Sequence, residues 1–193
     1  MKKTGWIILA VVALVVLWGF SSYNGLVSLD EGVKAQWAKV ETVYQRRLDL
    51  IPNVISTVKG VTKQEQDIFI KLAEARANYL NAKTSGTIDD QNSNLQLLNQ
   101  TLGQARVQLL ALAENYPQLK SADAFRDLIS ELEGSENRIA VERSRYNDTV
   151  KDYNIRIRRI PTNIIAALTG FGPHKLFEAD AGANKAPAVD FTK

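Results

Sequence analysis

The stretch YNGLVSLDEGVKAQWAKVETVYQRRLDLIPN, residues 23–53, decides the fold, because its apolar residues recur with helical spacing. Two rows run through it and slightly beyond, each with members seven positions apart, and together they form the stripe of an amphipathic helix. The spacing predicts a helix over residues 23–59 that ends at Gly60. The two rows are Val33, Val40, Arg47 and Val54, and Trp37, Tyr44, Ile51 and Val58.

The apolar run in front of this stretch is long enough to cross a bilayer. MKKTGWIILAVVALVVLWGFSSY, residues 1–23, places Lys2 and Lys3 before an uncharged apolar run. About 20 helical residues extend about 30 Å, the thickness of the hydrocarbon core. The lysines favour a cytoplasmic N-terminus. A cleaved signal peptide is the alternative, but its cleavage site would be GFS at residues 19–21, a poor match, so we expect a retained anchor over residues 4–23.

Helical spacing continues beyond this first helix. TKQE, residues 62–65, is a capping box that predicts the start of a second helix, and the polar residues 81–94 predict a loop. A third helix is expected to end before Pro117, and a fourth to run from an N-cap at Ser121 to Ile160. The predicted inward-facing residues are Ile68, Leu72, Ala75 and Tyr79, then Leu95, Leu98, Leu102, Ala105, Leu109, Leu112 and Tyr116, and finally Leu132, Ile139, Tyr146, Tyr153 and Ile160.

Four such stripes are most simply buried in an all-α fold, an antiparallel four-helix bundle with two long and two shorter helices on a single transmembrane helix. We therefore expect a cytoplasmic tail at 1–3, the anchor at 4–23, an extracytoplasmic bundle at 24–161, and a membrane-proximal apolar patch with an irregular tail at 162–193. The patch either contacts lipid or closes the end of the bundle. Candidate lipid or partner contacts are Arg156, Arg158, Arg159, Ile164, Ile165, Leu168 and Phe171.

Charged and polar residues interrupt the stripe at YQRRLDLIPN, residues 44–53. If Leu26 and Ile160 mark equal heights above the membrane, equal counting along both helices places this stretch level with residues 135–147. Charges enter the stripe there too. We therefore expect the two stretches to satisfy each other.

The expected network would set register and specificity, because buried ion pairs add little net stability. We predict that Arg47 pairs with Glu142, and that Asp49 pairs with Arg138 or Asn137. The alternative is that these charges are solvated and that the leucine after Arg47 takes its place in the stripe. The predicted network comprises Arg46, Arg47, Asp49, Asn53, Asn137, Arg138 and Glu142.

Composition narrows the chemistry. The chain has no cysteine and one histidine, His174, which we expect to be an exposed loop residue. A di-iron bundle needs two Glu-x-x-His pairs, and a haem bundle needs axial His or Met, so we expect no metal and no cofactor. No nucleophile motif accompanies the histidine, and the acidic residues read as solvated charges, so no catalytic residue is assigned. A net charge of +3 is too small to indicate nucleic-acid binding.

A Tyr-Asn dipeptide recurs at Tyr23, Tyr146 and Tyr153, the last two one heptad apart. Two interpretations stay open. The tyrosines are core residues with an asparagine beside them, or the dipeptides form a hydrogen-bonding ladder or a partner-binding face.

Three stretches resemble the LemA family: YNGLVSLDEGVKAQWAKVETVYQRRLDLIPNVISTVKG at residues 23–60, ENRIAVERSRYNDTVKDYN at 136–154 and IPTNIIAALTGFGPHKLFEADAGA at 160–183. The resemblance implies a bacterial membrane-anchored protein with an extracytoplasmic helical bundle and no established biochemical activity. Family genes often neighbour genes for membrane metallopeptidases and small membrane proteins, which implies an accessory role in the envelope.

We therefore expect a non-enzymatic scaffold or interaction protein in the bacterial inner membrane, with the lipid bilayer, copies of itself or another envelope membrane protein as partners. Two alternatives remain. One is an envelope-acting enzyme or substrate-binding module that uses unidentified carboxylates. The other is a membrane-remodelling protein that binds anionic lipid.

Overall fold

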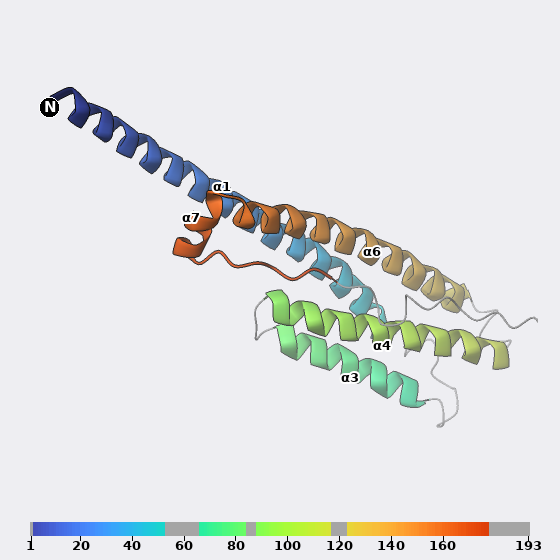
Figure 1. Cartoon of the computed structure of the whole chain (residues 1–193). Helices are drawn as coiled ribbons and strands as arrows, with labels where there is room; N and C mark the ends of the chain where they lie inside the picture. Colours follow the sequence, from blue (N-terminus) through green and yellow to red (C-terminus); the bar gives the residue numbers. More distant parts are fainter. Residues whose placement is uncertain (1, 53–65, 84–87, 117–122, 178–193) are drawn as a thin grey trace, which may run out of the picture. The chain divides into compact units, whose positions relative to one another are not determined.

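Every regular element that the structure describes is an α-helix (Figure 1). The computed structural model describes residues 2–52, 66–83, 88–116 and 123–177. Within these ranges the all-α expectation is confirmed. The described helices are α1 (Lys2–Asp49), α3 (Gln66–Lys83), α4 (Ile88–Asn115), α6 (Asp123–Arg158) and α7 (Thr162–Thr169).

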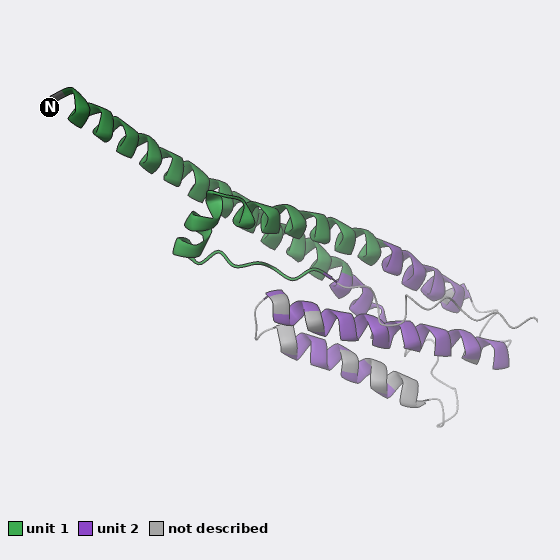
Figure 2. Ribbon diagram, viewed as in Figure 1, with its two compact units in different colours: residues 1–43, 138–176 green, residues 44–137, 177–193 purple. Residues whose placement is uncertain are grey.

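The chain divides into two compact units, which we describe separately (Figure 2). Unit 1 contains residues 1–43 and 138–176, and unit 2 contains residues 44–137 and 177–193. Unit 1 therefore holds most of α1, the second half of α6, and α7. Unit 2 holds the end of α1, the pair α3 and α4, and the first half of α6.

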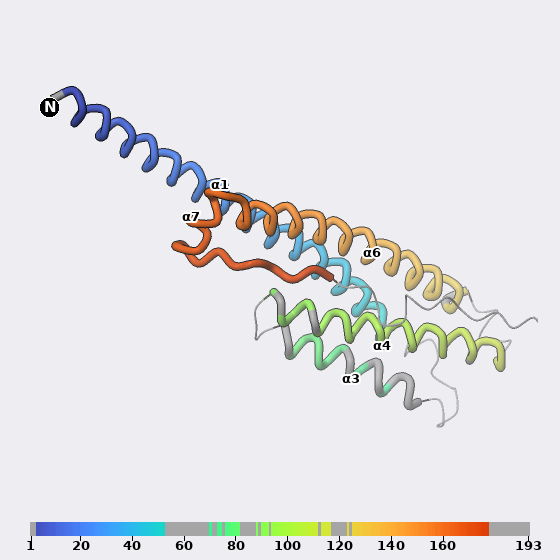
Figure 3. The backbone as a smooth tube through the Cα atoms, viewed as in Figure 1, coloured from blue at the N-terminus to red at the C-terminus, as the bar shows by residue number. Residues whose placement is uncertain are grey.

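Helix α1 is unbroken over 48 residues (Figure 3). Its large side chains are exposed from Trp6 to Phe20, and burial begins at Ser22 and is complete at Leu26. In the described part of the chain, α1 is the one helix that is long and apolar enough to cross a membrane. The change from exposed to buried side chains therefore falls within one continuous helix.

The end of α1 differs from the prediction. Helix α1 ends at Asp49, where the Leu50 N–H donates to the Arg47 carbonyl at 3.3 Å in a turn, and residues 51 and 52 are helical again. Pro52 explains this end, because proline has no N–H to donate to the carbonyl four residues earlier. Residues 53–65, with the predicted helix end and the capping box, lie outside the described residues.

The core of unit 1 forms where the predicted rows of α1 meet those of α6. The Trp37 ring lies edge-on to the Tyr146 ring, with centroids 5.4 Å apart. The predicted stripes are confirmed by the burial of Val33, Trp37, Val40, Ile139, Tyr146 and Tyr153. The prediction that Ile160 faces inward is wrong, because this residue is 83% exposed. Helix α6 ends at Arg158, and the proline at 161 disfavours a helical conformation for the residue before it.

The core of unit 2 rests on α4, against which α3 packs. The α4 stripe is confirmed by the burial of Leu95, Leu98, Leu102, Ala105 and Leu109, and the α6 stripe by that of Leu132. Tyr79 of α3 is buried as predicted, and Tyr116 is half-buried. The side chains of Ile68, Leu72, Ala75 and Leu112, and the residues Val54, Val58, Pro117 and Ser121, lie outside the described part.

The predicted loop at residues 81–94 is mostly helical. Helix α3 continues to Lys83 and α4 begins at Ile88, so only 84–87 fall between them. Asp90 stands in the first turn of α4, where a carboxylate interacts favourably with the helix dipole. Polar composition suggested a loop there, but polar residues are compatible with a helix when they follow its exposed face.

The apolar patch after Pro161 also forms a helix, α7. It ends at Thr169 and is capped by Gly170, whose φ of 80° is the left-handed conformation that glycine adopts without strain. The Phe171 N–H donates to the Ala166 carbonyl at 3.0 Å and satisfies part of the helix end. Beyond it, residues 171–177 are irregular, as predicted, and residues 178–193 lie outside the described part.

Candidate functional site

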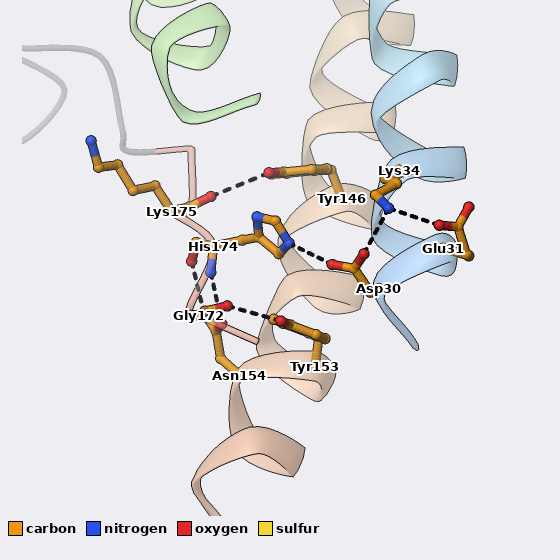
Figure 4. Close-up of polar contacts among 9 residues, drawn as sticks. All are labelled: Asp30, Glu31, Lys34, Tyr146, Tyr153, Asn154, Gly172, His174 and Lys175. Carbon is orange, nitrogen blue, oxygen red and sulfur yellow. Dashed lines mark hydrogen bonds and ion pairs between the residues drawn. The ribbon is translucent and has the colours of Figure 1, made fainter. Parts of the chain in front are cut away.

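The irregular segment after α7 is held against unit 1 by side chains of α6 (Figure 4). We call residues 171–176 the strap. Tyr153 Oη donates to the Gly172 carbonyl at 2.8 Å, and Tyr146 Oη donates to the Lys175 carbonyl at 3.4 Å. The Asn154 amide donates to the His174 carbonyl at 2.9 Å and accepts from the His174 N–H at 3.0 Å. Side chains of α6 thus supply the strap's backbone with hydrogen bonds that it does not form within a helix or a sheet.

The spacing of the Tyr-Asn dipeptides explains this arrangement. Tyr146 and Tyr153 are seven residues apart on the buried stripe of α6, so their hydroxyls leave the helix on the same side. Asn154 follows at once and reaches the same backbone. Both interpretations of these dipeptides hold in part: Tyr146 and Tyr153 are buried core residues, and their hydroxyls, with the Asn154 amide, form hydrogen bonds to the chain's own strap.

The strap is also held from α1. His174 Nε2 lies 3.0 Å from Asp30 Oδ1, and the Tyr153 ring lies 5.0 Å from the imidazole. Lys34 Nζ lies 2.8 Å from the other Asp30 oxygen and 2.7 Å from Glu31. The His174 side chain is only 21% exposed, so the prediction of an exposed loop histidine is wrong. The sequence around His174 has no helical or strand periodicity, so it does not indicate that contacts with a helix distant in sequence order this segment.

These contacts change the ionisation of the cluster. Burial raises the pKa of Asp30, but the hydrogen bonds from His174 and Lys34 outweigh it, so the pKa lies below its usual value. The Asp30 carboxylate also raises the pKa of Lys34. Burial, with a contribution from Asp30, raises the pKa of Tyr153 to about 12, so its phenol remains a donor at neutral pH. The ionised carboxylate accepts, so the imidazole nitrogen that faces it carries a proton.

A second polar cluster lies in unit 2 around Arg47, which is 1% exposed. Its guanidinium donates to Asn99 Oδ1 at 3.1 Å and lies 3.9 Å from Glu136. Burial lowers the pKa of Arg47, and the Glu136 carboxylate opposes that effect. Glu136 also accepts from Arg106 at 2.8 Å, and Arg106 reaches Glu133 at 2.9 Å.

The predicted pairing of Arg47 with Glu142 is replaced by these contacts. Within unit 1, Glu142 accepts from Gln36 at 2.7 Å and from Arg145 at 2.6 Å. Counting residues from Leu26 and Ile160 compares heights along two helices, but it does not say which side chains of packed helices meet.

The other predicted network residues lie as follows. Arg46 lies 3.3 Å from Glu131, and Asp49 accepts from Gln45 at 3.0 Å within α1, in place of a bond to Asn137 or Arg138. Asn137 and Arg138 are exposed, and Asn53 lies outside the described residues. Sequence reasoning missed Asp30, Asn99, Arg106 and Glu136, which carry no local signal because each reads as an ordinary polar helix residue.

The described residues of unit 2 also form a groove of about 420 Å³ between α3 and α4. Among the described residues that line it, Glu74 is the one carboxylate, and Tyr79 and Leu98 form part of the wall. A glycosidase-type site would need a second carboxylate. Among the described residues no group of three or more His, Cys, Asp or Glu side chains could hold a metal ion.

Comparison with known proteins gives two findings. The model of the LemA family matches residues 36–191. The chain is also similar to magnetosome proteins: it is 28% identical to MamQ 1 and to MamQ 2 of Paramagnetospirillum magneticum, over 89% of this chain and 70% of each relative. It is 27% identical to MamQ of Magnetospirillum gryphiswaldense, over 77% of this chain and 62% of that protein.

Replacing Asn154 with Ala should release the strap, because it removes both hydrogen bonds to the His174 backbone. We expect faster amide exchange across residues 171–176 and a loss of about 1–3 kcal/mol of stability. Hydrogen exchange with mass spectrometry on the full chain measures the first, and denaturant unfolding the second. Asn163→Ala, at an exposed position of α7, is the control and should change neither. Unchanged protection in Asn154→Ala would show that the strap does not depend on this residue.

Replacing Arg47 with Ala should cost about 3 kcal/mol, because it removes a fully buried, hydrogen-bonded side chain. Arg46→Ala, at the exposed neighbouring position, should cost less than about 0.5 kcal/mol. Arg47→Met keeps most of the volume and should recover much of the loss, since buried ion pairs add little net stability. Denaturant unfolding in detergent compares the three variants. Equal losses for Arg47→Ala and Arg46→Ala would contradict the buried network.

The Asp30 cluster predicts a specific pH dependence. The folded-state pKa of Asp30 lies below the unfolded value of 3.8, so its contribution is fully present above that pH and is lost as the pH falls through the lower, folded value. The difference in unfolding free energy between the native chain and Asp30→Asn should therefore be constant near neutral pH and shrink below about pH 4. Unfolding curves from pH 7 to pH 2 measure it. A difference that grows on acidification would contradict the assignment.

Proposed function

Because the chain belongs to the LemA family, we propose that it is a membrane-anchored, non-enzymatic scaffold or interaction protein of the bacterial cell envelope. In this proposal its folded part is held at a fixed distance from the membrane by α1 and binds copies of itself or another envelope membrane protein.

The continuity of α1 carries the proposal. Its exposed apolar side chains end at Phe20, and Leu26 is already fully buried in unit 1. Six residues correspond to about 9 Å of helix, so no linker separates the span from the folded part. A tethered binding module would be expected to have a flexible linker there, because freedom to search is its advantage. A stem without a linker supports a protein that presents surfaces at a set height and orientation.

For the topology we propose residues 1–3 in the cytoplasm, residues 4–23 across the inner membrane and residues 24–161 outside it as an antiparallel four-helix bundle. The two lysines before the span support the orientation. Within unit 1, Gln36 contacts Glu142 and the Cα of Gly32 faces Thr149, an order that supports antiparallel pairing of α1 with α6.

The polar groups of unit 1 support a non-enzymatic role. Tyr146, Tyr153 and Asn154 use their hydrogen-bonding groups on the strap backbone, and Asp30 uses its oxygens on His174 and Lys34. A catalytic group must offer an atom to a substrate. In unit 1 these polar side chains instead form contacts within the chain.

Self-association is the interaction that we favour. Val107 of α4 is 67% exposed on the side opposite the buried stripe, and Leu110 is exposed one turn further on. Covering such side chains gains about 25 cal/mol for each Å² of apolar surface removed from water. The membrane also confines copies of the chain to one plane with parallel stems, which favours lateral contact.

The test is the size and composition of the full-length complex, gently extracted from native membranes. We expect a defined assembly containing this chain alone, and we expect Val107→Asp to convert it to smaller species. Gln108→Asp adds the same charge at the next, exposed position and should leave the assembly intact. A second protein in fixed ratio would instead identify an accessory role. A lone monomer for the native chain would contradict both forms of the proposal.

A further inference from the structure

The position of α7 indicates a second contact with the membrane. The Ile165 side chain lies 4.0 Å from where a Cβ on Gly19 would be. The rings of Tyr23 and Phe171 lie 5.9 Å apart. Gly19 and Tyr23 lie in the turns of α1 that precede Leu26, the first fully buried apolar residue of this helix. Helix α7 therefore lies level with the end of the apolar span.

The two faces of α7 differ in what they contact. Thr162 and Ala166, four residues apart, are buried. Ile164 and Leu168, also four residues apart, point to the opposite side and are 56% and 78% exposed. The exposed apolar row begins before the helix with Ile160. A short helix with one face packed and the other exposed and apolar fits the boundary between lipid headgroups and acyl chains.

Basic residues stand directly before this helix. Arg156 and Arg158 close α6, Arg159 follows, and all three are exposed. Helix α7 itself has the sequence TNIIAALT and carries no charge. Anionic lipid attracts an uncharged apolar helix that is flanked by cationic side chains. The cationic groups stay near the lipid phosphates while the apolar side chains enter the membrane.

We propose that α7 lies in the headgroup region of the leaflet from which α1 emerges, with Ile160, Ile164 and Leu168 facing the acyl chains and the three arginines binding anionic lipid phosphates. The proposal rests on the anchoring of α1 in the membrane. The bilayer is the occupant because the exposed row lies beside the end of the span, so the two apolar surfaces are continuous. A soluble partner would have to enter the same layer as the lipid to cover it.

A second contact has a mechanical consequence. A single span leaves its helix free to tilt and to rotate about its own axis. Packing α7 against Gly19 and holding it in the interface ties one side of α1 to the membrane surface. Unit 1 would then present the same face relative to the bilayer in every copy, which favours lateral assembly.

The test exploits the absence of cysteine from the chain. The full-length protein is reconstituted into phosphatidylcholine vesicles with about 30% phosphatidylglycerol, a share that gives the anionic surface the arginines require. Single spin labels are attached at Ile164→Cys or Leu168→Cys, at Val12→Cys as a reference within the span, and at Val141→Cys as an exposed control on α6. Collision rates with oxygen and with a water-soluble nickel chelate then report the depth of each label.

We expect labels at 164 and 168 to collide with oxygen more than with the chelate, and their chelate collision rate to be at least about threefold lower than that at 141. Equal chelate access at 141, 164 and 168, with Val12→Cys still deep, would overturn this inference alone. Chelate access at position 12 would overturn the anchoring as well. Dipolar broadening between labels at 164 or 168 that disappears on dilution with unlabelled chain would place a second copy there and also overturn it.

The arginines are tested separately. Replacing Arg156, Arg158 and Arg159 together with Gln should make the label at 168 shallower in the anionic vesicles, and so should vesicles of phosphatidylcholine alone. Arg138→Gln, further along α6, should leave the depth unchanged. A depth at 168 that responds neither to the charge of the lipid nor to the three substitutions would overturn the assignment of anionic lipid. Circular dichroism confirms that each variant retains its helix content.

Discussion

Helix α1 must satisfy two environments in turn, and the rest of the structure depends on that constraint. Its exposed large side chains from Trp6 to Phe20 are apolar, and from Leu26 onward its residues alternate between a buried stripe and a polar face. One set of helical hydrogen bonds runs through both parts. The transition therefore needs no loop, and the helix transmits the direction of the span directly to the residues on which α6 packs.

The strap shows how irregular chain is stabilised next to helices. Its backbone groups would be costly to bury without partners, and side chains of α6 supply those partners at Gly172, His174 and Lys175. Each bond is worth about 1 kcal/mol, but together they select one path for the chain. Asp30 adds a charged contact from α1, so the strap is held by both helices of unit 1.

Arg47 follows a different logic. It occupies a position in an otherwise apolar heptad row and is buried, so its charge must be matched by Asn99 and Glu136. An apolar residue of similar size would stabilise the helix pair about as well. The arrangement is better explained by register: a buried guanidinium accepts only the alignment of α1, α4 and α6 that brings its partners to it.

The sequence by itself determined the local features of this protein. Helical periodicity predicted the all-α class, the buried stripes and the apolar span, because those signals lie within about seven residues of one another. Only the tertiary structure decided which polar residues meet. His174 and Asp30 are 144 positions apart, and Arg47 reaches Asn99 across 52 positions. No local pattern encodes such pairs, because they depend on how helices that are distant in sequence pack against one another.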